Sequence, residues 1–182
     1  QGYSSAASDV YKRQGCDRTL ARMNRKYSTA EFLVCVERLR RYFPGCALTA
    51  DMITGFPGET EADQAAAVTF LEQVGFAAVH VFPYSRRPGT KADAMPEQLS
   101  HAVKSARAHE AQRVADACKQ RYLAQQVGRI LPVLFETEHD GNWVGHSDNY
   151  CLVRVAGDNL RGLVKNVKIS AVSGQMLVGD LV

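Results

Sequence analysis

One junction limits the possible folds of this chain more than any other feature. Residues 46–53 form a mostly apolar run, and the sequence Gly-Phe-Pro-Gly-Glu-Thr follows at residues 55–60. Thr60 is a residue type that caps helices, and apolar side chains recur at helical spacing over residues 61–74. The junction is therefore predicted to join a strand to a helix in a βα unit. Ligands of such sheets bind at the carboxyl ends of the strands, which makes the junction a candidate site.

The neighbouring segments continue this pattern. Helices are predicted over residues 17–27 and 29–43, and a second apolar strand over residues 77–84. Ser28, followed three residues later by Glu31, forms a capping box at the start of the second helix. Helices and strands that alternate with short connections predict a parallel sheet with outer helices. The first strand, at residues 46–53, is mostly apolar without strict alternation, which is typical of a strand covered on both faces.

The middle of the chain predicts one long helix. Residues 97–126 contain neither Gly nor Pro and are rich in Ala, Gln, Lys and Arg. The apolar side chains form only a thin stripe, made of Leu99, Val103, Ala106, Val114, Ala117 and Leu123. A helix that is so weakly apolar is predicted to link two domains rather than to lie in a core.

The last third of the chain predicts a small all-β domain. Five short strands with tight turns are expected at residues 129–138, 142–146, 150–156, 163–172 and 175–182. This pattern is typical of a small closed or Greek-key barrel of the OB type. This segment contains five basic and six acidic side chains, which gives it a net charge of −1. Charge alone therefore does not support RNA binding by this barrel.

Composition excludes several classes of protein. No run of about 18 apolar residues exists that could form a transmembrane helix. The first residues lack a signal-peptide pattern, so a cytoplasmic location is expected. The net charge of +3 is too small to indicate a nucleic-acid binder. The five cysteines are not close to one another, so neither a disulfide framework nor a cysteine metal site is predicted.

Two loops that follow predicted strands are candidates for ligand binding. In residues 55–60 the glycines can simply supply a turn, which pattern alone favours, or can let the backbone and Glu59 approach a cofactor. Residues 84–90 place Arg86 and Arg87 beside Tyr84. Such a loop can bind phosphate or RNA or can merely be solvated, and the pattern leaves both alternatives open.

Several strings, in their order along the chain, resemble the radical-SAM methylthiotransferases. They are Gly-Cys-Asp at 15–17, Met-Asn-Arg-Lys-Tyr-Ser at 23–28, and residues 49–60 and 79–90. The terminal barrel is similar to a TRAM domain, and the resemblance covers about residues 15–182.

Within the family, residues 79–85 and 145–150 look most like the enzymes that modify tRNA threonylcarbamoyladenosine. The enzymes that modify isopentenyladenosine come next. The resemblance implies an enzyme that uses S-adenosylmethionine and two [4Fe–4S] clusters to add a methylthio group to C2 of an adenosine. The implied partner is the anticodon loop of tRNA, and no membrane is expected.

The resemblance also implies an architecture. The expected fold class is α/β, with the C-terminal part of a radical-SAM partial TIM barrel over residues 15–95. A linker helix would follow over residues 96–126, and an OB-like TRAM barrel over residues 127–182. Residues 1–14 do not resemble the family and show no clear periodicity. They are expected to lack regular structure and to be foreign to the gene, from an expression vector or a sequence-assembly error.

The resemblance further assigns candidate site residues. Those expected to shape the S-adenosylmethionine side are Arg25, Asp51, Gly55 and Glu59. Those expected on the adenosine or RNA side are Tyr84 and Arg87. The family holds one cluster with a Cys-x-x-x-Cys-x-x-Cys motif, which these 182 residues do not contain. No catalytic residue and no metal ligand are therefore expected in this chain, which should be inactive by itself.

Two competing interpretations follow from the residues alone. The first is an RNA-binding module that consists of the barrel and holds no clusters. Its affinity for tRNA would fall as the salt concentration rises and would survive deletion of residues 1–95. The second is an inert and partly unfolded fragment, because half of an open barrel exposes sheet edges.

Overall fold

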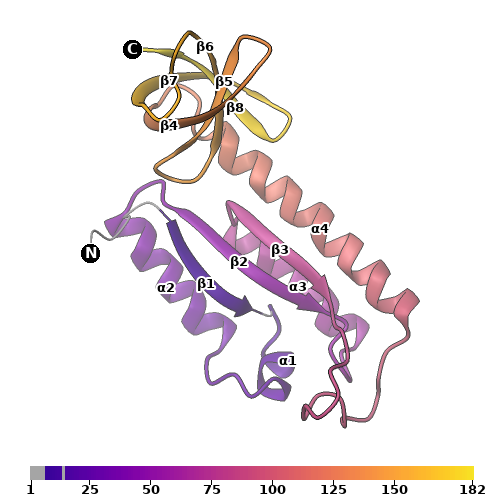
Figure 1. Cartoon of the computed structure of the whole chain (residues 1–182). Helices are drawn as coiled ribbons and strands as arrows, with labels where there is room; N and C mark the ends of the chain where they lie inside the picture. The colour runs from indigo at the N-terminus through magenta and orange to yellow at the C-terminus, as the bar shows by residue number, and fades with distance from the viewer. Residues whose placement is uncertain (1–6, 14) are drawn as a thin grey trace. The chain divides into compact units, whose positions relative to one another are not determined.

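The chain contains two compact units, a mixed α/β unit and a small β-barrel. The computed structural model describes residues 7–13 and 15–182 (Figure 1). The sheet unit comprises residues 9–44 and 48–119, and the barrel unit is built mainly from residues 120–182. Within the described residues, no helix is long and apolar enough to cross a membrane.

Three strands and four helices belong wholly or partly to the sheet unit. Their bounds are β1 Ala7–Arg13, α1 Asp17–Arg22, α2 Thr29–Tyr42, β2 Ala47–Thr54, α3 Glu61–Val74, β3 Ala78–Pro83 and α4 His101–Ala124. The sheet has the order β1-β2-β3, and β2 pairs in parallel with β3 from Thr49 opposite Ala78 to Thr54 opposite Pro83. The predicted βα unit around residues 46–74 is confirmed.

Strand β1 differs from the prediction for the start of the chain. Residues 7–13 form a strand at the edge of the sheet, beside β2, where no regular structure was expected. Residues 1–6 and 14 lie outside the described residues. A strand here does not bear on whether residues 1–14 are foreign to the gene, because an unsatisfied sheet edge can pair with a segment of many sequences.

Local capping explains where α2 and α3 begin. The Ser28 hydroxyl accepts from the Glu31 N–H at 3.2 Å, while the Glu31 carboxylate accepts from the Ser28 N–H at 2.8 Å. Thr60 and Asp63 form the same reciprocal pair at the start of α3. Both predicted N-termini are confirmed, and the second fixes where the junction loop ends.

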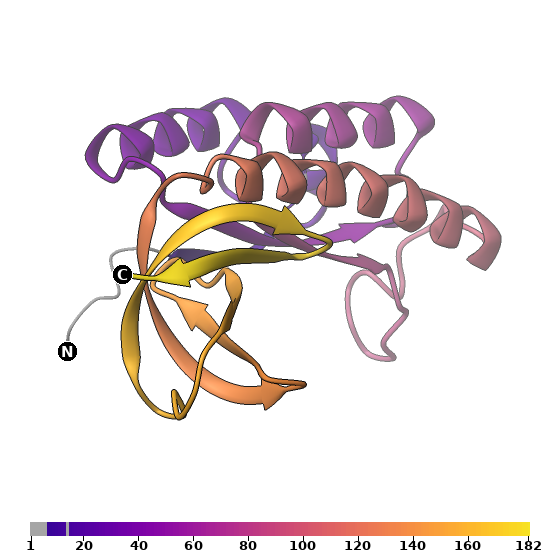
Figure 2. The ribbon, with the colours of Figure 1, turned by 90° about the horizontal axis from the view of Figure 1, so that it is seen from above.

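The sheet is covered on one face, whereas the strand at residues 46–53 was predicted to be covered on both. Figures 1 and 2 show α2 and α3 along the same side of the strands. On the covered face, Ala50 and Met52 are buried. On the other face, Asp51 is half-buried beside the exposed His80, and Phe82 is 50% exposed. The apolar run in β2 therefore reflects one packed face and one open face of the sheet.

Helix α4 packs more closely than a linker was predicted to pack. Its buried side chains lie on a face of small residues that includes Ala108, Ala111, Ala115 and Cys118. In the sheet unit, the Gln64 side-chain amide of α3 donates to the Arg107 carbonyl at 3.2 Å. The predicted stripe was largely wrong, because alanines let the helix backbone approach α3 closely while Val103 is left exposed.

The barrel unit confirms five strands and a closed barrel. The bounds are β4 Ile130–His139, β5 Asn142–Ser147, β6 Leu152–Ala156, β7 Val164–Ser173 and β8 Met176–Leu181. The strand order is β4-β5-β6-β8-β7, and β4 also pairs with β7, which closes the barrel. Large buried side chains fill its interior: Val133, Phe135, Trp143, Val153, Ile169 and Leu177. A closed five-stranded barrel in Greek-key order is compatible with an OB-like TRAM domain.

A buried amide joins the end of α4 to this barrel. Asn149 is 5% exposed, and its side-chain NH₂ donates to the Tyr122 hydroxyl at 3.0 Å and to the Gln126 side-chain carbonyl at 3.2 Å. Its carbonyl accepts from the Ser147 hydroxyl at 2.6 Å. Burial also raises the pKa of Tyr122, so this hydroxyl stays protonated. The loop at residues 145–150 therefore has a structural role within the barrel unit.

Candidate functional site at the junction of β2 and α3

The loop between β2 and α3 is folded back by its own glutamate. The Gly55 N–H donates to Glu59 Oε1 at 2.9 Å, and the Glu59 N–H donates to the Phe56 carbonyl at 2.9 Å. Gly55 has φ of +70°, a backbone conformation that a side chain would strain. A Cβ at this position would lie 2.4 Å from Lys104 Cγ. The glycine is therefore required both by the turn and by the close approach of α4.

An arginine from α4 completes this loop. Arg107 Nη1 donates to Glu59 Oε1 and to the Glu59 backbone carbonyl, both at 2.9 Å. The two side chains are 7% and 2% exposed, so the ion pair is buried. Arg107 Nη2 also reaches the exposed Glu61 carboxylate at 2.6 Å. One guanidinium therefore holds the backbone and the carboxylate of the loop together, in the geometry that Arg supplies best.

Burial dominates the electrostatics of Glu59. It raises the pKa of this carboxyl above the ordinary value of 4.5, although the Gly55 N–H and the Arg107 charge act in the opposite direction. Burial alone would lower the pKa of Arg107. Its carboxylate partners Glu61 and Glu59 outweigh this effect and raise the pKa of the guanidinium. Without Arg107, the Glu59 charge would have no ionic partner in a buried position.

Tyr84 lies at the same edge of the sheet as the junction. Its N–H donates to the Thr54 carbonyl at 2.8 Å, which continues the β2–β3 pairing to the strand ends. Its ring packs edge-on against Phe56 with centroids 5.3 Å apart. Lys104 Nζ lies 5.6 Å from the centroid of the Tyr84 ring, within the range of a cation–π contact. The ring is buried, with 9% of the residue exposed, so in this structure it is not free to stack on a base.

Two buried hydroxyl groups at this edge are unsatisfied. Thr54 Oγ1 and Tyr84 Oη have no hydrogen-bond partner among the described residues. Buried polar groups in proteins are nearly always paired, so these two hydroxyls are groups that a bound polar molecule could satisfy. Thr54 ends β2 and Tyr84 directly follows β3, which places both orphans where parallel sheets bind ligands. The edge therefore fits a polar cofactor, with Glu59 shaping the loop while its own carboxylate is occupied.

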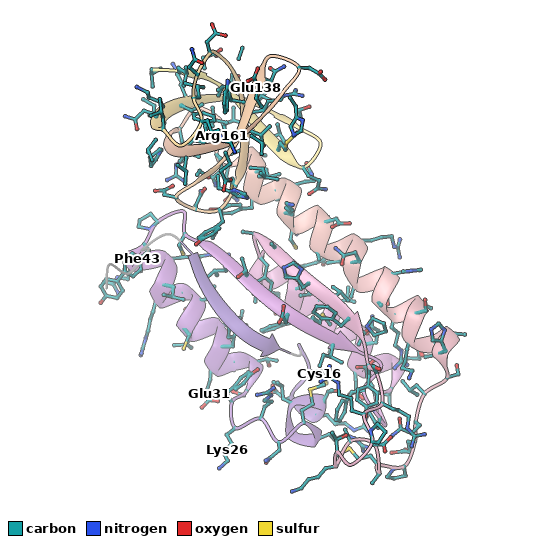
Figure 3. The ribbon with its side chains drawn as sticks, viewed as in Figure 1. Cys16, Lys26, Glu31, Phe43, Glu138 and Arg161 are labelled. Carbon is teal, nitrogen blue, oxygen red and sulfur yellow. The ribbon has the colours of Figure 1, made fainter. Side chains whose placement is uncertain are left out.

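The start of the family-like region is tied to the first turn of α3. The Cys16 thiol, whose residue is labelled in Figure 3, donates to Asp63 Oδ1 at 3.2 Å, and Arg18 forms an ion pair with the same carboxylate. Burial opposes ionisation of Asp63, but the bonds from Thr60 and Cys16 and the Arg18 charge hold its pKa below the ordinary range. Cys16 thus serves as a hydrogen-bond donor in this structure.

The predicted site residues do not all come together. Gly55 and Glu59 are bonded to each other, and Tyr84 contacts the same loop through Phe56. Arg25 and Arg87 are exposed, and Asp51 lies on the open face of the sheet opposite His80 in the register.

Sequence reasoning missed Arg107 and Lys104. Both come from a helix that was predicted to be a linker, and nothing in its composition distinguishes these two from its other basic residues. Their spacing of three residues places them on one helix face, which is the one signal that was available.

No metal centre is visible in the described part of the chain. Within residues 7–13 and 15–182, no three His, Cys, Asp or Glu side chains gather in positions to hold a metal ion.

Comparison with known proteins gives consistent matches along most of the chain, although no profile of a known protein family matches it. The threonylcarbamoyladenosine tRNA methylthiotransferase MtaB of Bacillus subtilis is 36% identical over 161 residues, which cover 85% of this chain and 36% of that protein. The tRNA-2-methylthio-N(6)-dimethylallyladenosine synthase of Maricaulis maris is 39% identical over 170 residues, which cover 92% of this chain and 37% of that protein. The synthase of the same name from Nitratidesulfovibrio vulgaris Hildenborough is 37% identical over 175 residues, which cover 91% of this chain. The chain thus spans between a third and two fifths of the length of these relatives.

Proposed function

Because this chain is homologous over most of its length to the radical-SAM tRNA methylthiotransferases, we propose that the protein it belongs to is a tRNA methylthiotransferase. The proposed reaction adds a methylthio group to C2 of threonylcarbamoyladenosine next to the anticodon. The observation that carries the proposal is the match to MtaB of Bacillus subtilis over 85% of the chain. The strings at residues 79–85 and 145–150 favour this substrate.

The sheet unit is proposed to be the C-terminal part of a radical-SAM partial TIM barrel. Its parallel β2–β3 pair and its outer helices have the arrangement that such a barrel requires. The open face that carries Asp51 and His80 would then face the interior of the complete barrel. This assignment explains why a polar pair lies in the middle of two apolar strands.

The β2–α3 junction is proposed to form part of the S-adenosylmethionine site. When bound, S-adenosylmethionine and two [4Fe–4S] clusters supply the radical and sulfur chemistry. Gly55 would bring backbone close to the cofactor, and Glu59, held by Arg107, would fix that backbone in place. Asp51 on the open face and the exposed Arg25 would contribute charge to the same side.

The side of the molecule that meets RNA is proposed to include Arg87 and the barrel. Arg87 is exposed, and its carbonyl accepts from the Thr90 hydroxyl at 2.8 Å, so its loop is held by its own bonds. Tyr84 would act from beneath this loop, by supporting Lys104, because its ring is buried. Sequence-specific RNA recognition favours single-stranded loops, which agrees with the anticodon loop as the partner.

Two alternative functions are each supported by a specific observation. Dimethylallyladenosine, which is the isopentenyladenosine named above, is an equally good substrate by similarity, because the synthase of Maricaulis maris is 39% identical to this chain. A cluster-free RNA-binding module is supported by the closure of the barrel into a unit of its own.

Nucleoside analysis of tRNA separates these functions. In a strain from which the full gene is deleted, the proposal predicts loss of the 2-methylthio form of threonylcarbamoyladenosine. Loss of the methylthio form of dimethylallyladenosine instead would establish the first alternative. Retention of both methylthio nucleosides would refute both enzyme functions, and the RNA-binding module would be the function that remains.

A further inference from the structure

The loop that follows β3 is attached at both of its ends to the β2–α3 junction. At its start, the Tyr84 N–H donates to the carbonyl of Thr54, the last residue of β2, at 2.8 Å. At its end, the Glu97 carbonyl accepts from the Gly58 N–H at 3.0 Å. We call residues 85–96, between these two attachments, the strap. The strap therefore begins and ends on the loop that is proposed to bind the cofactor.

Hydrogen bonds within the strap tie its parts to one another. Arg86 Nε donates to Asp93 Oδ1 at 2.7 Å, and Arg86 Nη2 donates to the Asp93 carbonyl at 3.1 Å. The Gln98 side-chain amide donates to the carbonyls of Ala92 and Met95, at 2.9 and 3.0 Å. Coupling between two sites is carried by such chains of bonded and packed groups. The strap is therefore expected to move together with its attachment points.

Arg22, the last residue of α1, contacts both partners of the second attachment. Its Nη2 forms an ion pair with Glu97 Oε2 at 3.4 Å. Its guanidinium covers Gly58, where an added Cβ would lie 2.5 Å from Arg22 Cζ. Gly58 also has φ of +74°, so both the turn and the arginine require a glycine here. We call Arg22, Gly58 and Glu97 together the latch.

The latch contains two features that lower stability. Glu97 has φ of +60°, in the left-handed region that a glutamate seldom adopts. Arg22 Nε is buried, and it has no hydrogen-bond partner within the described part of the chain. Unpaired buried donors are rare, and strained residues gather at ligand clamps and switch regions. Stability alone therefore does not explain why these residues meet at this point.

We propose that Arg22 and Glu97 are positioning residues that couple the cofactor loop to the strap. The exposed Arg87, assigned above to the RNA side, lies on the strap, and Gly58 lies in the cofactor loop. Whichever ligand binds first orders both segments, so RNA and S-adenosylmethionine each strengthen the binding of the other by the same factor. The identity of the two ligands rests on the proposed function, whereas the latch is a property of this chain.

The first test is hydrogen exchange in the 182-residue chain, followed by mass in peptides that cover residues 55–60 and 85–96. Arg22→Ala is expected to raise the exchange rate about fivefold in both segments, which is the effect of one lost ion pair. Lys26→Ala is the matched control, because Lys26 is an exposed basic residue four positions further along the chain (Figure 3). Its rates are expected to stay within about twofold of the wild type.

Far-ultraviolet circular dichroism checks that each variant keeps its helices. Should Arg22→Ala lose them, Glu97→Lys is the second variant, because it places two positive charges together at a side chain that is 61% exposed. It is expected to raise exchange in both segments at least as much. Wild-type rates in the folded variants, faster exchange in one segment only, or an equal effect in Lys26→Ala would overturn the latch.

The second test measures the coupling itself, in the full-length protein with its clusters intact. The Kd of S-adenosylmethionine is measured with and without tRNA. In the wild type, tRNA is expected to lower this Kd at least about fivefold, and in Arg22→Ala less than about twofold. A merely structural role of Arg22 would weaken both ligands and leave the ratio unchanged.

The outcomes of the second test separate the coupling from the proposed function. An unchanged ratio in Arg22→Ala, or no effect of tRNA in the wild type, overturns the coupling while the proposed function stands. Absence of S-adenosylmethionine binding by the wild-type protein overturns both together.

Discussion

Removal of Arg107 provides a quantitative test of how the junction loop is held. The Arg107→Met substitution keeps most of the side-chain volume but leaves Glu59 buried without its ionic partner. The Glu59 side chain is 2% exposed, so solvent cannot replace the lost interaction. Breaking a buried pair from one side costs about 3–5 kcal/mol. The contact with Glu61 adds little, because that carboxylate is 89% exposed.

The assay is urea unfolding followed by two probes. Far-ultraviolet circular dichroism reports mainly the helices, most of which belong to the sheet unit, whereas Trp143 fluorescence reports the barrel. The free energy of unfolding from circular dichroism is expected to fall by about 3–5 kcal/mol near neutral pH, and the fluorescence transition is expected not to move. In the double variant Glu59→Gln with Arg107→Met, most of this loss is expected to be recovered, since no charge remains buried.

The pH dependence of this loss follows from the raised pKa of Glu59. Burial raises that pKa in the folded state, and loss of Arg107 raises it further. A raised folded-state pKa means that the folded chain binds the proton more tightly, so stability falls as pH rises through the folded-state value. The penalty in Arg107→Met is therefore smallest below the ordinary pKa of 4.5 and largest at neutral pH. A loss below about 1 kcal/mol, or one that does not vary with pH, would refute the buried ion pair as the element that holds the loop.

Three further predictions concern other parts of the chain. Gly55→Ala is expected to cost at least about 2 kcal/mol, because its Cβ would clash with Lys104. Gly89→Ala, which has a similar φ but nothing within 4 Å, is expected to cost about 1 kcal/mol in the same unfolding assay. Asn149→Ala is expected to lower barrel stability by about 1–3 kcal/mol through its lost buried bonds, whereas the exposed Asn166→Ala should change it by less than about 0.5 kcal/mol. Incubation of the purified chain with iron and sulfide is expected to leave no [4Fe–4S] absorbance, and a stable cluster with matching iron content would contradict this.

Local sequence signals predicted most of the secondary structure. Each capping box depends on two residues three positions apart, so Ser28 with Glu31, together with Thr60, located two helices without any tertiary information. The turns of the barrel are likewise set by short Gly-containing pairs, and the pattern of five strands followed from them. These features are encoded within a few residues of where they act.

The features that the sequence did not predict depend on contacts between distant segments. Arg107 meets Glu59 across 48 positions, and no local pattern marks either residue as half of a buried pair. The Tyr84 ring contacts Phe56 and Lys104, and Lys104 belongs to α4, a helix whose small residues gave no strong apolar stripe. Coverage of one sheet face was missed because the run at residues 46–53 is apolar overall, which hid the alternation of Asp51 with the buried Ala50 and Met52.

The most direct test of the central claim is methylthiolation by the full-length protein that contains this chain. Purified protein is supplied with S-adenosylmethionine and a reductant, and is given tRNA that carries either threonylcarbamoyladenosine or dimethylallyladenosine. The nucleosides are then separated and identified by mass. The account predicts a methylthio product on threonylcarbamoyladenosine. Absence of product on both tRNAs, from protein with its clusters intact, would contradict the assignment of this chain to a tRNA methylthiotransferase.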